Sequence, residues 1–277
     1  LIYRGYDIEK NEKVILKTLY TERLNLSNIE KLNYEYDIAQ KVNSVKGIVK
    51  TTKLEDWQGR PVLVKEDFVG SSLKKMIESN EITIEKFLDW TIQIVDILDD
   101  IHKNKVIHLD INPNNILINE DGEIKIIDFG CSKLMGIEVE DNKNNKQLEG
   151  TLEYISPEQT GRINRKLDYR ADYYSLGVTF YQLLTGKLPY GNSDKLELVY
   201  AHIAKEPIPP TKINATIPKV LSDIIMKMMA KTPEERYQSI IGLKTDLRRC
   251  QASIEANGSV EYFPIGKNDI SIRLKIS

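Results

Sequence analysis

The chain has 277 residues, of which 41% are hydrophobic and 29% are charged. That balance supplies both a core and a solvated surface, and it excludes disorder as the overall state. A formal charge of −2 leaves no basic excess for nucleic acid, and no apolar run approaches the roughly 18–20 residues that span a bilayer. The two cysteines lack the spacing of metal ligands, so we expect reduced thiols in a cytoplasmic protein. Because the chain does not begin with Met, we expect it to be a fragment.

Residues 1–68 predict a small, β-rich lobe. Segments 14–16 and 62–64 are short apolar runs typical of buried strands, and the second follows a turn at 59–61. Between the strands, apolar and aromatic side chains recur on one face at helical spacing: Ile29, Leu32, Tyr36 and Ala39. Residues 69–72 break the pattern, so we place the boundary between two lobes there.

Beyond that break the sequence predicts a larger, mainly helical lobe. Apolar side chains form a stripe of about four helical turns: Phe87, Trp90, Ile94, Ile97, Leu98 and Ile101. Segment 173–184 is so apolar that we expect a helix buried on most sides, and 220–229 and 240–250 predict amphipathic helices that close the domain. The expected fold class is therefore α+β, with a second lobe that spans 69–254.

Three oxygen-bearing side chains stand at the ends of predicted strands. Asp110 and Asn115 lie in a loop between two apolar strands. Asp128 follows the next strand, beyond a hairpin turn at Gly122. Mg²⁺ prefers hard oxygen ligands, so Asp128 and Asn115 are candidate metal ligands. Asp110 would remain free to accept a proton from a nucleophilic hydroxyl.

At these residues the chain resembles the catalytic and metal-binding motifs of eukaryotic-type protein kinases. The resemblance implies a bilobal protein kinase-like fold, ATP and Mg²⁺ as cofactors, and Asp110 as the residue that orients the accepting hydroxyl. It also implies that an activation segment ends at 156–158, where Glu158 pairs with Arg236. Asp172 is implied to be the buried support of the catalytic loop.

The same resemblance implies a nucleotide site. Lys17 would hold the α- and β-phosphates of ATP, with Glu35 on the following helix as its ion-pair partner and Asp37 as the nearby alternative. The hinge between the lobes would offer backbone groups to adenine from Glu66 to Phe68. The adenine ring would lie among three apolar side chains: Ile15, Leu117 and Ile127. The implied metal ligands are Asn115 and Asp128, and the implied catalytic residues are Asp110, Lys17 and Asn112.

Two departures from the kinase pattern bear on regulation. Kinases usually carry an arginine before the catalytic aspartate, where it binds a phosphorylated residue of the activation loop, whereas this chain has Leu109. Residues 133–150 also contain no Ser, Thr or Tyr. We therefore expect a site that is organised constitutively or is controlled by a neighbouring domain.

Two further departures bear on the chemistry. Asn112 stands where Ser/Thr kinases usually have a lysine that neutralises charge on the transferring phosphoryl group. An amide donates a hydrogen bond but carries no charge, so we expect some electrostatic stabilisation to be lost. Lys65 stands near the back of the adenine pocket, where apolar residues are usual, and it either lines that pocket or points elsewhere. Thr151, in contrast, resembles the threonine that positions Asp110 in Ser/Thr kinases.

Segments 149–165 and 168–177 resemble a subgroup, the N-terminal Ser/Thr kinase domains of large bacterial-type signalling proteins. Those proteins continue into an ATPase module, a GAF domain and a sensor histidine kinase, and they share the Asp-Ile-Asn-Pro-x-Asn form of the catalytic loop. The resemblance implies that 255–277 is a linker to a following module and that a Gly-rich phosphate loop lies upstream of Leu1. Besides a protein substrate, the implied partners are ATPase and sensor histidine kinase modules in the same chain.

Three functions remain open on the sequence alone. An active kinase would transfer the γ-phosphoryl group of ATP to Ser or Thr hydroxyls of proteins in signal transduction. The alternative is a nucleotide-binding pseudokinase that acts as a regulatory interaction module, an interpretation favoured by Leu109, Asn112 and Lys65. The third is a phosphotransferase that acts on a small molecule.

Overall fold

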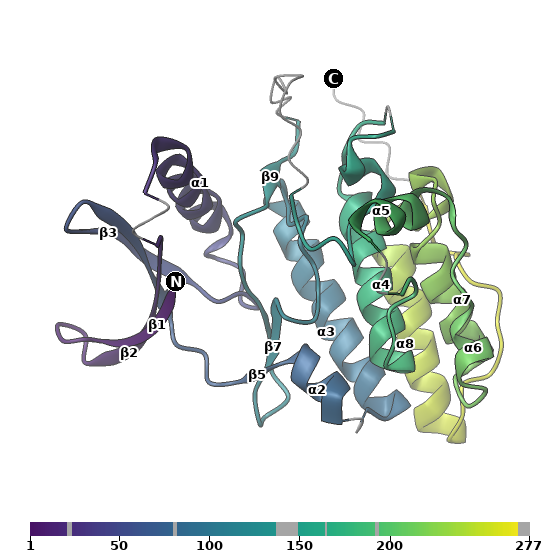
Figure 1. Ribbon diagram of the computed structural model, residues 1–277. Coiled ribbons are helices and arrows are strands. Elements are labelled where there is room, and N and C mark those ends of the chain that lie inside the picture. Colours follow the sequence, from purple (N-terminus) through teal and green to yellow (C-terminus); the bar gives the residue numbers. More distant parts are fainter. Residues whose placement is uncertain (21–23, 80–81, 137–148, 164, 192–193, 271–277) are drawn as a thin grey trace, which may run out of the picture.

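The structure is a computed structural model that describes residues 1–20, 24–79, 82–136, 149–163, 165–191 and 194–270 (Figure 1). Its N-terminal lobe is an antiparallel four-stranded sheet with one helix against it. Along the sheet the strands follow the order β1-β2-β4-β3. They span Ile2–Asp7 (β1), Glu12–Thr18 (β2), Thr51–Trp57 (β3) and Arg60–Glu66 (β4), and the helix is α1, Leu26–Val42.

Helix α1 turns one face toward strands β3 and β4. The helix begins after Asn25, whose side chain accepts the backbone N–H of Asn28 and so caps the first turn. Its buried side chains are Leu32, Glu35, Ile38, Ala39 and Val42. Glu35 is the charged member of this buried set, so its position requires a cation nearby.

The C-terminal lobe consists mainly of helices, with short strands at the side that faces the N-terminal sheet (Figure 1). One small sheet has the order β5-β7-β8, and a separate pair joins β6 to β9. The strands are β5 (Ser71–Ser72), β6 (Val106–Ile107), β7 (Ile116–Ile118), β8 (Ile124–Ile126) and β9 (Lys133–Leu134). The helices are α2 (Leu73–Ser79), α3 (Ile84–Lys103), α4 (Arg170–Thr185), α5 (Lys195–Ala204), α6 (Pro210–Ile213), α7 (Lys219–Met228) and α8 (Ile240–Asn257), with 3₁₀ turns at Pro157–Thr160 and Pro233–Glu235.

Helices α3 and α4 form the centre of the larger lobe. Helix α3 begins after Thr83, whose hydroxyl accepts the backbone N–H of Lys86, and its apolar stripe is buried as the sequence predicts. Every residue of α4 from Ala171 to Leu183 is buried, which confirms the helix expected to be covered on most sides. Gly177 lets α7 approach closely, because a Cβ at this position would lie 2.8 Å from the Cβ of Met228.

A buried ion pair fastens the segment before α4 to the rest of the lobe. The Arg236 guanidinium binds the Glu158 carboxylate through N···O distances of 2.6 and 2.8 Å, and both side chains are inaccessible to solvent or nearly so. Its remaining N–H groups donate to the backbone carbonyls of Ala230, Arg170 and Lys231. Because the donors of the guanidinium are satisfied, the buried charge does not leave an unpaired polar group.

The two-lobed α+β fold is the one that the sequence predicts. Strands β1 and β3 and helices α2 and α5 were not predicted, since each is short or lies at an edge and lacks a clear apolar period. After α8, Phe263 is 3% exposed within the core and Asp269 accepts the backbone N–H of Ser239, so the described part of 258–270 packs on the larger lobe. Its role as a linker stays a prediction. Within the described residues, no helix is long and apolar enough to cross a membrane.

Candidate active site

Lys17 connects three elements at the junction of the lobes. It lies on β2, and its Nζ is 3.0 and 2.9 Å from the two carboxylate oxygens of Glu35 on α1. The same Nζ is 2.8 Å from Oδ1 of Asp128, which follows β8. Glu35 is 3% exposed, so the Lys17–Glu35 ion pair implied by the resemblance is present and shielded from water.

The ion pairs keep both partners of the Lys17–Asp128 contact charged. Burial alone would raise the pKa of the Asp128 carboxyl, but the charge and hydrogen bond of Lys17 outweigh it and hold that pKa at about 2. Burial alone would lower the pKa of Lys17, whereas Asp128 and Glu35 together raise it above its ordinary value. Asp128 is therefore a carboxylate at neutral pH, as a metal ligand must be.

Asp110 is held by donors on both of its carboxylate oxygens. Oδ1 accepts the backbone N–H and the hydroxyl of Thr151, each at 2.8 Å. Oδ2 accepts Nδ2 of Asn115 at 2.8 Å, and the same amide nitrogen donates to the Asp110 carbonyl at 2.9 Å. Two segments that are about 40 residues apart in sequence thus fix the orientation of one carboxylate.

Asn115 and Asp128 fit the requirements of a magnesium site shared with nucleotide phosphates. The nitrogen of the Asn115 amide binds Asp110, so its carbonyl oxygen is the atom that would face a cation. Among the described residues there is no group of three or more His, Cys, Asp or Glu placed to hold a metal. Mg²⁺ commonly takes only one or two protein oxygens and completes its shell with water and substrate phosphates, so two ligands suffice.

Asn112 holds the catalytic loop together through hydrogen bonds of its side chain. It is 1% exposed, and its Nδ2 lies 3.0 Å from the Asp110 carbonyl and 3.2 Å from the Thr151 hydroxyl. Its Oδ1 accepts the backbone N–H of Asn114. The amide hydrogens therefore stabilise the contact between Asp110 and Thr151 instead of pointing toward a transferring group. Asn112 is one of the three implied catalytic residues, and the described geometry favours a positioning role for it.

The backbone of the catalytic loop is held in a strained shape by Asp172. This carboxylate is fully buried on α4 and accepts the backbone N–H groups of His108 and Leu109 at 2.9 and 2.7 Å. Nε2 of His102 lies 2.8 Å from the same carboxylate. Leu109 adopts a φ of +62°, a region that costs a branched side chain on the order of 1–3 kcal/mol. The buried hydrogen bonds offset that cost, which agrees with the supporting role implied for Asp172.

The Leu109 side chain occupies an apolar cluster where the usual arginine would meet a phosphate. Leu109 is 4% exposed and packs with Ile107 and Ala171. The half-buried neighbours of this cluster are Cys131, Met135 and Leu167. The start of the activation segment is thus anchored by apolar packing and by the β6–β9 strand pair.

The residues implied to surround adenine lie around the end of β4. Ile15, Leu117, Ile127 and Phe68 are all half-buried. The Glu66 carboxylate binds Nζ of Lys125 at 2.5 Å, and the same Nζ lies 5.0 Å from the centre of the Phe68 ring. The Glu66 side chain is held by Lys125 and its backbone N–H donates to the Lys50 carbonyl at 3.0 Å, so its backbone carbonyl is the group that would meet a base.

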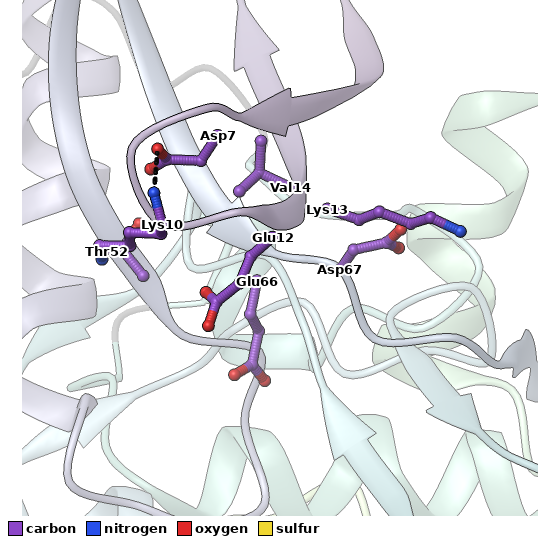
Figure 2. A pocket seen from close by; sticks show the side chains of 8 residues that line it. All are labelled: Asp7, Lys10, Glu12, Lys13, Val14, Thr52, Glu66 and Asp67. Carbon is purple, nitrogen blue, oxygen red and sulfur yellow. Dashed lines mark hydrogen bonds between the residues drawn. The ribbon is translucent and has the colours of Figure 1, made fainter.

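A separate pocket lies on the other face of the N-terminal sheet. Figure 2 shows its lining, in which Val14, Glu66 and Asp67 face charged side chains from the turn between β1 and β2. The turn is closed by the backbone N–H of Lys10, which donates to Asp7 at 3.1 Å. Side chains alternate along a strand, so Val14 faces away from Lys17. This pocket therefore shares hinge residues with the nucleotide site but contains none of the candidate catalytic residues.

Lys65 has a partner that sequence reasoning missed. Its Nζ lies 2.9 Å from Oε1 of Glu35, and its side chain is 9% exposed. The available signal was strand alternation: Lys65 pairs with Ile15 across the sheet, and Ile15 shares a face with Lys17. That register places two lysines on one face, but it does not show that both reach the same carboxylate.

The comparisons with known proteins agree with this geometry. A sequence profile described as the protein kinase domain matches residues 1–245. This chain belongs to the protein kinase domain family. The kinase domain is 36% identical over 178 residues to a probable serine/threonine-protein kinase of Clostridium acetobutylicum, an overlap of 64% of this chain and 26% of that protein. It is 28% identical over 264 residues to serine/threonine-protein kinase PksC of Streptomyces coelicolor, covering 92% of this chain and 47% of PksC.

A third relative has a different domain context. The kinase domain is 33% identical over 234 residues to hybrid signal transduction histidine kinase G of Dictyostelium discoideum, covering 60% of this chain and 7% of that protein. The chain spans about a quarter to a third of the length of the first three curated relatives, at 26%, 27% and 37%. These relatives thus carry long regions for which this chain has no counterpart in the match.

Proposed function

We propose that this kinase domain transfers the γ-phosphoryl group of ATP to Ser or Thr hydroxyls of protein substrates in signal transduction. The observation that carries the proposal is the support of Asp110, whose two carboxylate oxygens are bound by Thr151 and by Asn115. A carboxylate held in this way can orient a hydroxyl and accept its proton. Membership of the protein kinase family and the Ser/Thr kinase names of several relatives support the same reaction.

Each candidate residue has a task in this reaction. Lys17 binds the phosphates and is itself oriented by Glu35 and Asp128. Asp110 aligns the acceptor hydroxyl with the phosphorus and takes its proton as the bond forms. Asn115 and Asp128 would hold Mg²⁺, which neutralises phosphate charge when bound.

The neutral Asn112 distinguishes this site from Ser/Thr kinases that carry a lysine there. Its amide holds the Asp110 backbone and the Thr151 hydroxyl, so it contributes through geometry and not through charge. The four residues that the reaction needs most are nevertheless present as two bonded pairs, Lys17 with Asp128 and Asp110 with Asn115. No observation on the described residues favours the pseudokinase alternative.

The proposal also covers the domain boundaries and the modules that follow the kinase domain in the same chain. We assign the N-terminal lobe to 1–68, the C-terminal lobe to 69–254 and a linker to 255–277, followed by ATPase and sensor histidine kinase modules in one cytoplasmic chain. The match to a hybrid signal transduction histidine kinase and the run at 149–177 support this arrangement.

A transfer assay with an inactive control tests the proposal. Mg·ATP labelled at the γ-phosphate is supplied with a generic protein substrate, and the wild-type chain is compared with D110N. We expect label on Ser or Thr of the protein, loss of that label in D110N and an unchanged Kd for Mg·ATP, because Asp110 does not contact Lys17. Transfer to an aminoglycoside or sugar but not to protein would contradict the proposal, and so would nucleotide binding without any transfer.

A further inference from the structure

The Glu35 carboxylate is shared by two lysines from neighbouring strands. Oε1 of Glu35 lies 3.0 Å from Nζ of Lys17 on β2 and 2.9 Å from Nζ of Lys65 on β4. The second oxygen, Oε2, lies 2.9 Å from Lys17 alone. A single buried carboxylate thus binds two ammonium groups, which lie within about 6 Å of each other because both contact Oε1.

The second lysine changes the charge balance of the site. Lys17 also binds Asp128 at 2.8 Å, so one ammonium would otherwise serve two carboxylates. With Lys65 present, two cations face two anions, and Glu35 at 3% exposure stays paired whichever way Lys17 turns. A buried carboxylate left without a partner is strongly destabilising, so a redundant cation protects the position of α1.

We propose that Lys65 is a second cation of the nucleotide site: it is a positioning residue that holds the Glu35 carboxylate in place, so that the Glu35–Lys17 pair stays oriented for phosphate binding. The part of this inference that concerns phosphate rests on the proposed function, whereas the pairing of Glu35 does not. Lys65 also provides positive charge in a site whose catalytic loop has the neutral Asn112. The cation sits at the end of β4 and not next to Asp110, so it acts on the nucleotide side of the reaction.

A double-mutant cycle in the absence of nucleotide tests the pairing. The variants are K17M, K65M and K17M/K65M, and the readout is the melting temperature. We expect each single change to lower Tm by only about 2–3 °C, because Glu35 keeps one cation. The double change should lower Tm by at least about 6 °C more than the two single losses added together. In the double variant Glu35 is buried without a partner.

A matched control shows whether the coupling is specific. Lys53 on β3 lies 3.7–3.9 Å from exposed or half-buried carboxylates and does not contact Glu35. The Tm loss of K17M/K53M should therefore equal the sum of the losses of K17M and K53M within about 1–2 °C. Additive behaviour of K17M/K65M, or coupling of the same size in K17M/K53M, would overturn the proposed pairing.

Nucleotide affinity tests the second half of the inference. In K65M and in K65Q, Lys17 alone must hold Glu35 while it also binds Asp128, so the Glu35–Lys17 pair is less firmly oriented, and we expect the Kd of Mg·ATP measured by calorimetry to rise about tenfold. An unchanged Kd in both variants would overturn the claim that Lys65 positions the Glu35–Lys17 pair for nucleotide. A wild-type chain that binds Mg·ATP but transfers no phosphate would contradict the proposed function and would leave the melting-temperature cycle interpretable. An additive cycle in an active chain would overturn this inference alone.

Discussion

The backbone N–H of Leu109 donates a 2.7 Å hydrogen bond to Asp172, and this contact holds Leu109 at a φ of +62° beside Asp110. Its side chain is thereby directed into an apolar cluster with Ile107 and Ala171. In kinases with an arginine at this position, a phosphate on the activation loop completes the contact. In this chain apolar packing of Leu109 takes the place of the arginine–phosphate contact, so the catalytic loop can be ordered without phosphorylation.

An arginine at position 109 should therefore destabilise the fold. L109R would place a guanidinium where the Leu109 side chain now packs against Ile107 and Ala171, and we expect it to lower the free energy of unfolding by about 3–5 kcal/mol. Urea denaturation of the purified chain measures this loss. L109M keeps the volume and apolar character and should cost less than about 1.5 kcal/mol. An L109R chain as stable as L109M would contradict the packing account.

The hydroxyl of Thr151 should contribute to turnover and not to nucleotide binding. It donates to Asp110 at 2.8 Å and accepts from Asn112 at 3.2 Å. A hydrogen bond to a charged group contributes about 1.5–3 kcal/mol, so T151A should lower kcat about 10- to 100-fold with little change in KM for ATP. Steady-state kinetics check this, with T151S as the control that keeps the hydroxyl. An equal loss of kcat in T151A and T151S would show that the Thr151 hydroxyl does not account for the effect on turnover.

The buried and exposed arginine pairs should differ sharply in their effect on stability. R236M leaves Glu158 buried without a cation and should lower the free energy of unfolding by about 3–5 kcal/mol. Arg165 forms a 2.7 Å pair with Glu234, but these side chains are 40% and 62% exposed, so R165M should cost no more than about 1 kcal/mol. Chemical denaturation of both variants measures the difference. Similar losses would argue against burial as the cause.

The low pKa of Asp128 predicts how this carboxyl responds to acid. Lys17 holds the pKa at about 2, below the 3.8 of an unperturbed aspartate. A group with a lowered pKa in the folded state stabilises the fold fully above about pH 4, and that contribution is lost as the pH falls toward 2. Carboxyl ¹³C NMR of the wild-type chain should show a midpoint near 2, and in K17M the midpoint should move upward. An unchanged midpoint in K17M would contradict the assigned cause.

The catalytic motifs could be predicted from sequence because their chemistry resides in short runs. Asp110 and Asn115 are five residues apart in one loop, so local spacing brings the two together, and the structure shows them bonded. The long helix α3 could also be predicted, since its apolar stripe runs for several turns. Strand β3 was not, because Lys53, Glu55 and Asp56 interrupt any alternation at the edge of the sheet.

The roles of Asn112 and Lys65 could not be predicted, for a common reason. Each depends on a partner that is distant in sequence: Thr151 lies 39 residues after Asn112, and Glu35 lies 30 residues before Lys65. The motif shows that Asn112 is neutral, but only the packed fold shows that its amide is bound within the loop. Likewise, Lys65 looked like an anomaly in an apolar pocket until the position of α1 revealed the carboxylate that it binds.

We expect this kinase domain to be catalytically assembled without phosphorylation of its activation segment. The most direct test treats the chain with a phosphatase, removes the phosphatase and then measures transfer of the γ-phosphoryl group from Mg·ATP to Ser and Thr of a protein substrate, with D110N as control. We expect an initial rate equal to that of the untreated chain and no transfer by D110N. A treated chain that binds Mg·ATP but transfers phosphate only after a lag, or not at all, would contradict it.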